Sequence, residues 1–192
     1  TIEGPFRLLE QANGDPAEVV NSVTRTTARR WSARRKMEVY GLPFATLIDP
    51  GVDITGADLA KDIIVFQNAT IGPHVSVSEA SAIFMGAIVG HESQLGRCCV
   101  VAANAVLNAR VQMGDGVYVG SNASILPEVR IGAWATIAAG SMVMQNVPAG
   151  ATVMGVPGKI VYRLSPEQIL MLNAEFLPAV VRGQTILTWA FT

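Results

Sequence analysis

Aliphatic residues recur at every sixth position through the middle of the chain. A period of six fits neither the 3.6-residue repeat of a helix nor the alternation of a plain strand. It is typical of a parallel β-helix, in which each hexapeptide supplies one short strand and one corner. Every position of the series holds Val, Ile, Leu or Met: Val65, Ile71, Val77, Ile83, Val89, Leu95, Val101, Leu107, Met113, Val119, Ile125, Ile131, Ile137 and Val143.

A second series contains only small or β-branched residues, each of which follows an aliphatic residue of the first series by four positions. Three hexapeptides close a triangular coil of eighteen residues, so we expect the aliphatic residue to fill the interior and the small residue to fit beside the corner. Coils should stack about 4.8 Å apart, which is the usual strand spacing. The second series is Ala69, Val75, Ser81, Ala87, Ser93, Cys99, Ala105, Val111, Val117, Ala123, Val129, Ala135, Ser141 and Val147.

The pattern predicts about five coils from Ile48 to near Pro148. Ile48 and Ile54 are six residues apart, which places the first coil here, but counting onward from Ile54 misses Val65 by one. We therefore expect an irregular corner at residues 55–62. Glycine directly follows the aliphatic residue in six hexapeptides, and we expect these glycines to adopt positive φ at corners. They are Gly72, Gly90, Gly96, Gly114, Gly120 and Gly132.

Both flanks of the array contain helix signals. Asn21 is a candidate N-cap for a helix that reaches about Tyr40 and is closed by Gly41. The basic residues of this helix form either a solvated face or a patch that attracts a phosphorylated ligand. They are Arg25, Arg29, Arg30, Arg34, Arg35 and Lys36.

After the array, Gly155 to Lys159 has the composition of a terminating turn. Ser165-Pro166-Glu167-Gln168 has the pattern of a capping box with proline at the first helical position, and predicts a short helix to about Phe176. An apolar tail follows at residues 183–192. The chain thus divides into an N-terminal segment (1–47), a β-helix (48–160) and a C-terminal extension (161–192).

Composition excludes some functions. The net charge of −1 gives no general attraction to nucleic acid or to an anionic membrane. The sequence has neither a run of eighteen apolar residues nor a signal-peptide pattern, and we expect no part of it to span a membrane. The only cysteines, Cys98 and Cys99, are adjacent and unsuited to a structural disulfide, so we expect a reducing cytoplasm.

The candidate chemistry begins with the two histidines, His74 and His91. Their hexapeptides start eighteen residues apart, so they share one face of the triangle in adjacent coils, and Glu92 should stack over His74. Histidine titrates near neutral pH and is the natural general base there. A neighbouring carboxylate such as Glu92 orients the ring. The alternative interpretation of both histidines is ordinary surface polarity.

A column of small residues is the second candidate feature. Ala103, Ser121 and Ala139 are eighteen residues apart, and Gly120 and Gly140 flank two of them. Such a column leaves a shallow groove in which a pantetheine arm can bond to backbone groups. Alternatively, small residues here only ease the packing of coils.

Several motifs resemble the hexapeptide-repeat acyltransferases, in particular the bacterial sialic acid O-acetyltransferases and UDP-amino-sugar N-acetyltransferases. The resemblance covers roughly residues 44–160, and more weakly 21–40. It rests on Gly90-His91-Glu92 with Leu95-Gly96, Asn122 to Pro127, Ala138 to Ser141, and Gly155 to Lys159, where Gly158 replaces the usual Ala. It implies an all-β, left-handed parallel β-helix.

The resemblance also implies a function. His91 would be the general base, and Glu92 would raise its basicity. Acetyl-CoA would lie between subunits of a homotrimer, against Val100, Ser121 and Ala139, and the acceptor would be an amine or hydroxyl of a sugar or nucleotide sugar. Family members usually begin with a small Rossmann-like domain whose glycine-rich first loop helps to hold a nucleotide sugar. No such loop precedes residue 20 here, so either residues 1–47 are a remnant of a truncated domain or the substrate is held differently.

Two other functions compete with acyl transfer. A γ-type carbonic anhydrase on this fold needs three histidines on one zinc ion. Two histidines that are offset by one position do not supply that set, so no metal site is expected. A non-catalytic β-helix that serves as a scaffold or binding module needs neither His91 nor the small column, and acetyl-CoA affinity separates it from an acetyltransferase.

Overall fold

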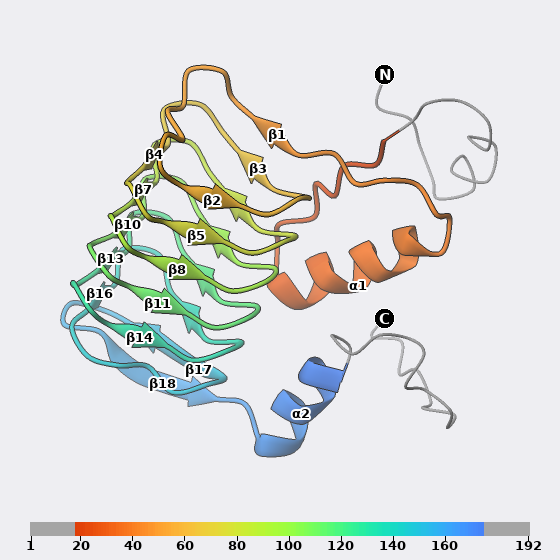
Figure 1. Cartoon of the computed structure of the whole chain (residues 1–192). Helices are drawn as coiled ribbons and strands as arrows, with labels where there is room; N and C mark the ends of the chain where they lie inside the picture. Colours follow the sequence, from red (N-terminus) through yellow and green to blue (C-terminus); the bar gives the residue numbers. More distant parts are fainter. Residues whose placement is uncertain (1–17, 175–192) are drawn as a thin grey trace.

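A computed structural model describes residues 18–174, which form a stack of short strands with two helices at its side (Figure 1). The elements are α1 (Thr27–Glu38), β1 (Leu47–Ile48), β2 (Asp58–Leu59), β3 (Ile64–Val65), β4 (Thr70–Ile71), β5 (Ser76–Val77), β6 (Ala82–Ile83), β7 (Ile88–Val89), β8 (Gln94–Leu95), β9 (Val100–Val101), β10 (Val106–Leu107), β11 (Gln112–Met113), β12 (Tyr118–Val119), β13 (Ser124–Ile125), β14 (Arg130–Ile131), β15 (Thr136–Ile137), β16 (Met142–Val143), β17 (Ala151–Met154), β18 (Lys159–Arg163) and α2 (Pro166–Ala174).

The strands form the three faces of a left-handed parallel β-helix of about six turns. One face is the sheet β1-β3-β6-β9-β12-β15-β17-β18, and the others are β16-β13-β10-β7-β4 and β14-β11-β8-β5-β2. The predicted fold class is confirmed. The prediction of five coils was too low, because β17 continues the first sheet beyond Pro148.

The six-residue pattern correctly identifies the interior. Every member of the aliphatic series and of the small series is buried, with no more than 7% of any residue exposed. Parallel pairing holds the repeat in register: Val119, for example, lies between Val101 and Ile137 in adjacent coils. Each interior residue therefore packs against its counterparts above and below.

The corners correct our expectation for glycine. Positive φ occurs three residues after the aliphatic residue and is mostly adopted by other residue types, such as His74 (58°), Glu92 (58°) and Arg110 (59°). The six glycines directly after the aliphatic residues lack positive φ and instead lie close to the next coil. A Cβ on Gly120 would lie 2.5 Å from the amide nitrogen of Ala139. Glycine is required there by close backbone approach.

The first coil is irregular, but earlier than predicted. Ile48 pairs with Val65, seventeen residues away rather than eighteen. Ile54 does not enter the interior and is 38% exposed, whereas Val52 is buried. Residues 49–57 contain no strand. Apolar character alone thus misassigned Ile54, because the chain leaves the hexapeptide register at this corner.

Helix α1 begins later than predicted. Its N-cap is Thr26, whose Oγ1 accepts a hydrogen bond from the backbone N–H of Arg29 at 3.2 Å. Asn21 is instead buried in the preceding segment, and its Nδ2 donates to the backbone oxygen of Arg30 at 2.8 Å. Threonine and asparagine are both good N-caps, so sequence preference does not separate them. The helix ends at Glu38, not at Tyr40.

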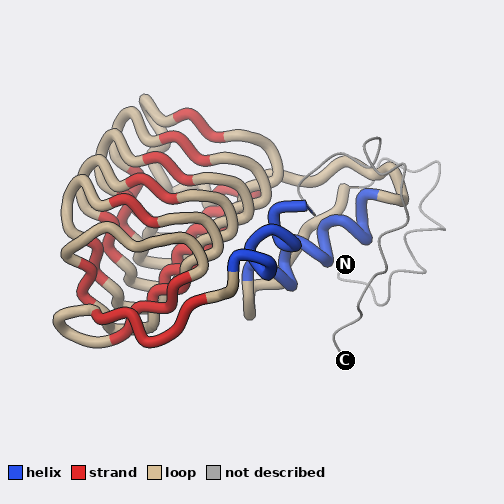
Figure 2. Tube along the Cα trace, turned by 90° about the horizontal axis from the view of Figure 1, so that it is seen from below, coloured by secondary structure: helices blue, strands red, loops and turns tan. Residues whose placement is uncertain are grey.

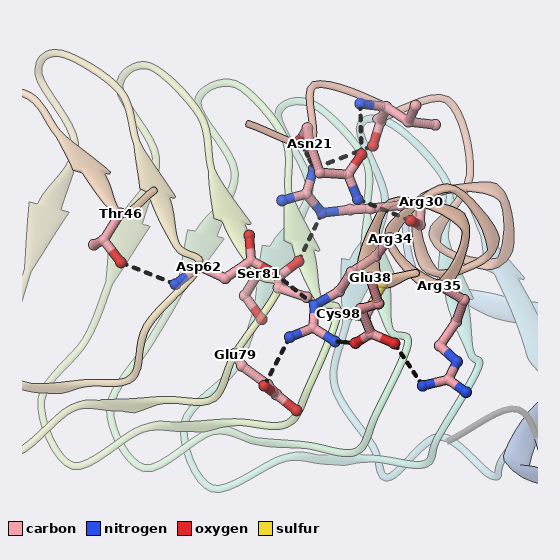
Figure 3. Close-up of polar contacts among 12 residues, drawn as sticks. Asn21, Arg30, Arg34, Arg35, Glu38, Thr46, Asp62, Glu79, Ser81 and Cys98 are labelled. Carbon is pink, nitrogen blue, oxygen red and sulfur yellow. Dashed lines mark hydrogen bonds and ion pairs between the residues drawn. The ribbon is translucent and has the colours of Figure 1, made fainter. Parts of the chain in front are cut away.

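Two arginines of α1 point into the protein (Figure 3). Arg30 is fully buried, and its Nε donates to the backbone oxygen of Ala80 at 2.6 Å. Arg34 is buried too; its Nε donates to Asp62 at 2.6 Å and its Nη2 to Glu79 at 3.0 Å. For these two residues, both a solvated face and a ligand patch were wrong interpretations, because their side chains attach the helix to one corner of the β-helix.

Burial governs the ionisable groups beneath α1. It raises the pKa of Asp62, although Arg34 and Arg30 act in the opposite direction, and it lowers the pKa of Arg30. It also raises the pKa of Cys98 to about 12 and that of Cys99 further. Both thiols are free, since Cys99 belongs to the interior cluster and Cys98 packs with Trp31 outside it.

The end of the described chain matches the predicted signals. The turn at 155–158 reverses the chain, and β18 pairs antiparallel with β17. Ser165 Oγ accepts from the N–H of Gln168 at 3.2 Å, and Gln168 Oε1 accepts from the N–H of Ser165 at 2.8 Å, which confirms the capping box of α2. Phe176 and the apolar tail at 183–192 lie outside the described residues. The three domain boundaries stay predictions.

Both helices lie on the same side of the stack (Figure 2). Trp31 of α1 and Trp134 of the β-helix share a cluster with Ala80 and Cys98, against which Ile169 and Leu172 also pack. Trp134 Nε1 donates to Asn173 Oδ1 at 2.8 Å. One of the three corners is therefore covered by helices, and the other two carry the candidate site residues.

Candidate active site

His91 and Glu92 lie together at the corner that follows β7. The Nδ1 of His91 is 2.8 Å from Oε2 of Glu92, and about half of each side chain is exposed, 49% and 50%. Gly90, just before them, lies so close to Asn108 in the next coil that a Cβ would be 2.6 Å from its carbonyl carbon. The pair is thus presented to solvent from a tightly packed backbone.

The carboxylate of Glu92 determines which histidine nitrogen is free. The hydrogen bond from His91 lowers the pKa of Glu92, and Arg110 contributes in the same direction, so Glu92 is ionised at neutral pH. An ionised carboxylate only accepts hydrogen bonds. The proton of a neutral His91 ring must then reside on Nδ1, which leaves Nε2 free to accept a proton from a substrate.

His74 lies one coil before Glu92 in the same corner column, as predicted from the eighteen-residue spacing. Its φ of 58° equals that of Glu92, as expected for equivalent corner positions. Among the described residues, however, the ion-pair partners of Glu92 are His91 and Arg110. His74 shares the column of Glu92 without being its partner.

Sequence reasoning missed Arg110. Its Nη1 lies 3.6 Å from Oε2 of Glu92, and its Nη2 lies 2.9 Å from Oε1 of Glu128. The signal was available, because Glu92, Arg110 and Glu128 are eighteen residues apart and therefore share a corner column.

The small-residue column lies at the corner that follows β9, β12 and β15. The carbonyls of Ala103 and Ser121 accept bonds from the next coil, from Asn122 at 3.1 Å and from Gly140 at 2.9 Å. These carbonyls are thus already occupied. By contrast, no hydrogen bond within the described chain uses the backbone N–H of Ala103, Ser121 or Ala139. The column offers N–H donors to a ligand.

The remaining predicted cofactor residues differ in accessibility. Ala139 and Gly140 are exposed, and Ser121 is half-buried. Gly120 is buried against the backbone of Ala139. Val100, in β9, is only 1% exposed, so the described chain does not offer its side chain to a ligand. Of these predicted cofactor residues, Ser121, Ala139 and Gly140 are therefore the accessible ones.

One chain does not bring the histidine pair and the column together. The column corner precedes the strands of the sheet β16-β13-β10-β7-β4, and the His91 corner follows them. The two features thus lie at opposite edges of one face. His91 also belongs to the coil of β6–β8, whereas Ala103, Ser121 and Ala139 occupy the next three coils.

No helix among residues 18–174 is both long enough and apolar enough to cross a membrane. No group of three or more His, Cys, Asp or Glu side chains in that range is arranged to hold a metal ion.

Comparisons with known proteins support the repeat and the fold. Residues 110–145 match the family model of the bacterial transferase hexapeptide (six repeats). None of the curated proteins compared with the chain matches it.

Three solved structures share the fold. The acetyltransferase domain of PglB from Neisseria gonorrhoeae, in complex with acetyl coenzyme A, is 20% identical, with a TM-score of 0.76 over 83% of this chain and 78% of that one. A mutant GDP-perosamine N-acetyltransferase from Caulobacter crescentus, with CoA and GDP-perosamine, is 24% identical, with a TM-score of 0.74 over 82% and 75%. A mutant of AntD, an N-acyltransferase from Bacillus cereus, bound to dTDP-4-amino-4,6-dideoxyglucose and coenzyme A, is 17% identical, with a TM-score of 0.61 over 69% and 87%.

Proposed function

We propose that the protein transfers an acetyl group from acetyl-CoA to an amine or hydroxyl of a sugar or nucleotide sugar. This proposal rests mainly on the exposed His91–Glu92 pair at a corner of a hexapeptide β-helix. In this pair, Nδ1 of His91 lies 2.8 Å from Oε2 of Glu92. Similar structures are described as complexes with CoA or acetyl-CoA, and two of them also with an amino-sugar nucleotide. We expect the reaction to take place in the cytoplasm, where acetyl-CoA is available.

His91 and Glu92 would have different roles in the reaction. As the acceptor attacks the thioester carbonyl, its nitrogen or oxygen must lose a proton, and Nε2 of His91 would take it. Glu92 would hold the ring and stabilise the imidazolium that forms. Such base catalysis contributes about 10² to 10⁴ in rate, and positioning of the two substrates adds to it.

The direct test is turnover of the full chain with acetyl-CoA and a set of amino-sugar nucleotides and free amino sugars. We expect release of free CoA thiol together with a product heavier by one acetyl group. Fragmentation of that product distinguishes N- from O-acetylation. A protein that binds acetyl-CoA but acetylates none of these acceptors would be a binding module and not the proposed enzyme.

The N–H donors of the small column support a cofactor path along Ser121, Ala139 and Gly140, with Gly120 and Val100 behind them. We expect Ala139→Trp to abolish acetyl-CoA binding in calorimetry, because the indole fills the shallow groove. Ala139 is exposed, so the melting temperature should change little. Ala60→Trp is the matched control, since Ala60 is also exposed but lies on another corner. Undiminished binding by the Ala139 variant would place the cofactor elsewhere.

A homotrimer would unite the two separated features. A contact between different surfaces of identical chains forms a closed ring when the rotation closes, and here it would place His91 of one subunit beside the small column of the next. The sheet between the two corners supports this arrangement, because it turns Ile88, Val106 and Met142 outward and Ile88 is 42% exposed. The outward residues of the sheet β14-β11-β8-β5-β2 are polar, Gln94 among them.

We expect light scattering to give about three times the chain mass of 20.3 kDa. Ile88→Arg should shift the protein toward monomers, because an unpaired charge in an apolar interface is costly. Gln94→Arg, on a polar face, should leave the trimer intact. A parent protein that is monomeric at micromolar concentration would contradict the proposed assembly and the shared cofactor site.

A further inference from the structure

Beyond the catalytic pair, the His91 corner carries a chain of contacts that runs over three coils. Oε2 of Glu92 accepts from His91 Nδ1 at 2.8 Å and lies 3.6 Å from Nη1 of Arg110. The Nε and Nη2 of Arg110 in turn lie 3.0 and 2.9 Å from Oε1 of Glu128. One carboxylate oxygen of Glu92 therefore faces both the candidate base and a cation that is held from the other side.

The backbone fixes the spacing of this chain. Glu92, Arg110 and Glu128 occupy the same corner position with φ of 58°, 59° and 64°. The N–H of each donates to the preceding coil: Glu92 to Pro73 at 3.0 Å, Arg110 to His91 at 2.9 Å and Glu128 to Ala109 at 3.0 Å. Stacked coils, and not a flexible loop, thus set the distances between the charges.

The side-chain charges alternate in sign along the column from Glu92 through Arg110 to Glu128. His74 lies one coil before Glu92, Arg110 one coil after it, and Glu128 one coil beyond Arg110. Glu92 places a negative charge beside His91, and Arg110 places a positive charge on the other side of the Glu92 carboxylate. Glu128 restrains Arg110 and partly neutralises it. The ion pair of Arg110 with Glu128 thus contacts the partner of His91 and not His91 itself.

We propose that Arg110, anchored by Glu128, is a positioning residue that fixes the Glu92 carboxylate and limits how strongly Glu92 holds the proton on His91. This inference rests on the proposed function, in which His91 is the general base. A base must be free of its proton when the acceptor arrives, and Arg110 shifts the balance toward that form. Glu128 prevents Arg110 from competing with His91 for Oε2 of Glu92.

The expected size follows from Coulomb's law. Across contacts of 2.8 and 3.6 Å, a unit charge in nearly aqueous surroundings shifts a titration midpoint by about half a pH unit. Salt screens charges at such an exposed site, so the shift should shrink at high ionic strength.

The test is an NMR titration of the full chain labelled with ¹³C-histidine, without substrates. The sequence contains two histidines, and His74→Asn assigns their signals. Arg110→Gln should raise the midpoint of His91 by about half a pH unit, and Glu128→Gln should lower it by less. The double variant should match Arg110→Gln, because Glu128 acts through Arg110, and Arg110→Lys should restore most of the parental value.

Arg97→Gln is the matched control. It also removes a cation and an ion pair, that of Arg97 with Asp115 at 2.8 Å, but at another corner. It should leave the midpoint of His91 unchanged. A midpoint in Arg110→Gln within about 0.1 pH unit of the parent, or below it, would overturn the proposal.

Activity separates this inference from the function on which it rests. In an active enzyme, the acidic limb of the pH profile of kcat/KM should move with the NMR midpoint in each variant. If the enzyme is active but the NMR midpoint of His91 does not move in the variants, the role of Arg110 is rejected and the proposed function stands. If the midpoint of His91 shifts as expected but the protein acetylates no sugar, the coupling between Arg110 and His91 stands and the proposed function is rejected.

Discussion

Replacing His91 with alanine is expected to lower turnover by about two to four orders of magnitude, the usual contribution of a general base. Glu92 cannot replace His91 as the base, because its carboxylate is ionised and engaged with His91 and Arg110. The KM for acetyl-CoA should change little, since His91 is not among the residues proposed to hold the cofactor. Steady-state kinetics with a competent sugar acceptor measures both quantities.

Two further variants define the expected pattern. Glu92→Gln should cost less than His91→Ala, because the imidazole remains and only its orientation and charge stabilisation suffer. His74→Ala should retain most of the activity, although it removes the same side chain one coil away. All three residues are exposed, so melting temperatures should stay near the parental value. Near-parental turnover of His91→Ala would rule out the mechanism even if the fold and the cofactor site are correct.

Replacing Val119 with aspartate is expected to unfold the chain. Val119 is fully buried in β12, between Val101 and Ile137 of adjacent coils. An unpaired charge buried at such a site costs several kcal/mol. That is a large share of the 5–15 kcal/mol by which a typical domain is stable. Circular dichroism and thermal melting should therefore show a largely unfolded protein at room temperature.

The matched control is Gln112→Asp, which adds the same charge to a neighbouring strand but on its exposed outer face. We expect its melting curve to resemble that of the parent. If Val119→Asp melted like the parent too, the aliphatic series would not form the interior.

The fold could be predicted because one rule repeats. Each hexapeptide places its aliphatic residue inside and its small residue beside the corner, so a long array averages out local exceptions. Where the rule lapses, prediction failed: Ile54 is aliphatic and correctly spaced from Ile48, yet it is exposed. At the first coil there is no preceding coil to impose the register.

Helix α1 was harder to interpret for a different reason. A run of arginines indicates a solvated surface unless the partners are known, and the partners here are distant in sequence. Arg34 pairs with Asp62 and Glu79, and Arg30 bonds to the backbone of Ala80. These contacts depend on how the helix docks on a corner, which no local pattern encodes.

The candidate site was partly accessible from the sequence. Adjacency placed His91 beside Glu92, and the eighteen-residue repeat placed Glu92 over His74, but side-chain orientation decides the partner. The Glu92 carboxylate pairs with His91 and Arg110, and His74 is not its partner. The repeat also identified the small column, but not that the carbonyls of Ala103 and Ser121 are occupied while the backbone N–H groups of the column are free.

The eighteen-residue coil also governs how this chain can change in length. Gain or loss of one whole coil would leave every later residue in its own column and move it along the stack by about one strand spacing, 4.8 Å. Gain or loss of a single hexapeptide would rotate all later residues by one face, so the corner of Glu128 would no longer lie beneath that of Glu92. Length can therefore vary by whole coils outside the site, or by loops that leave and rejoin at a corner, without dispersing residues assembled from separate coils.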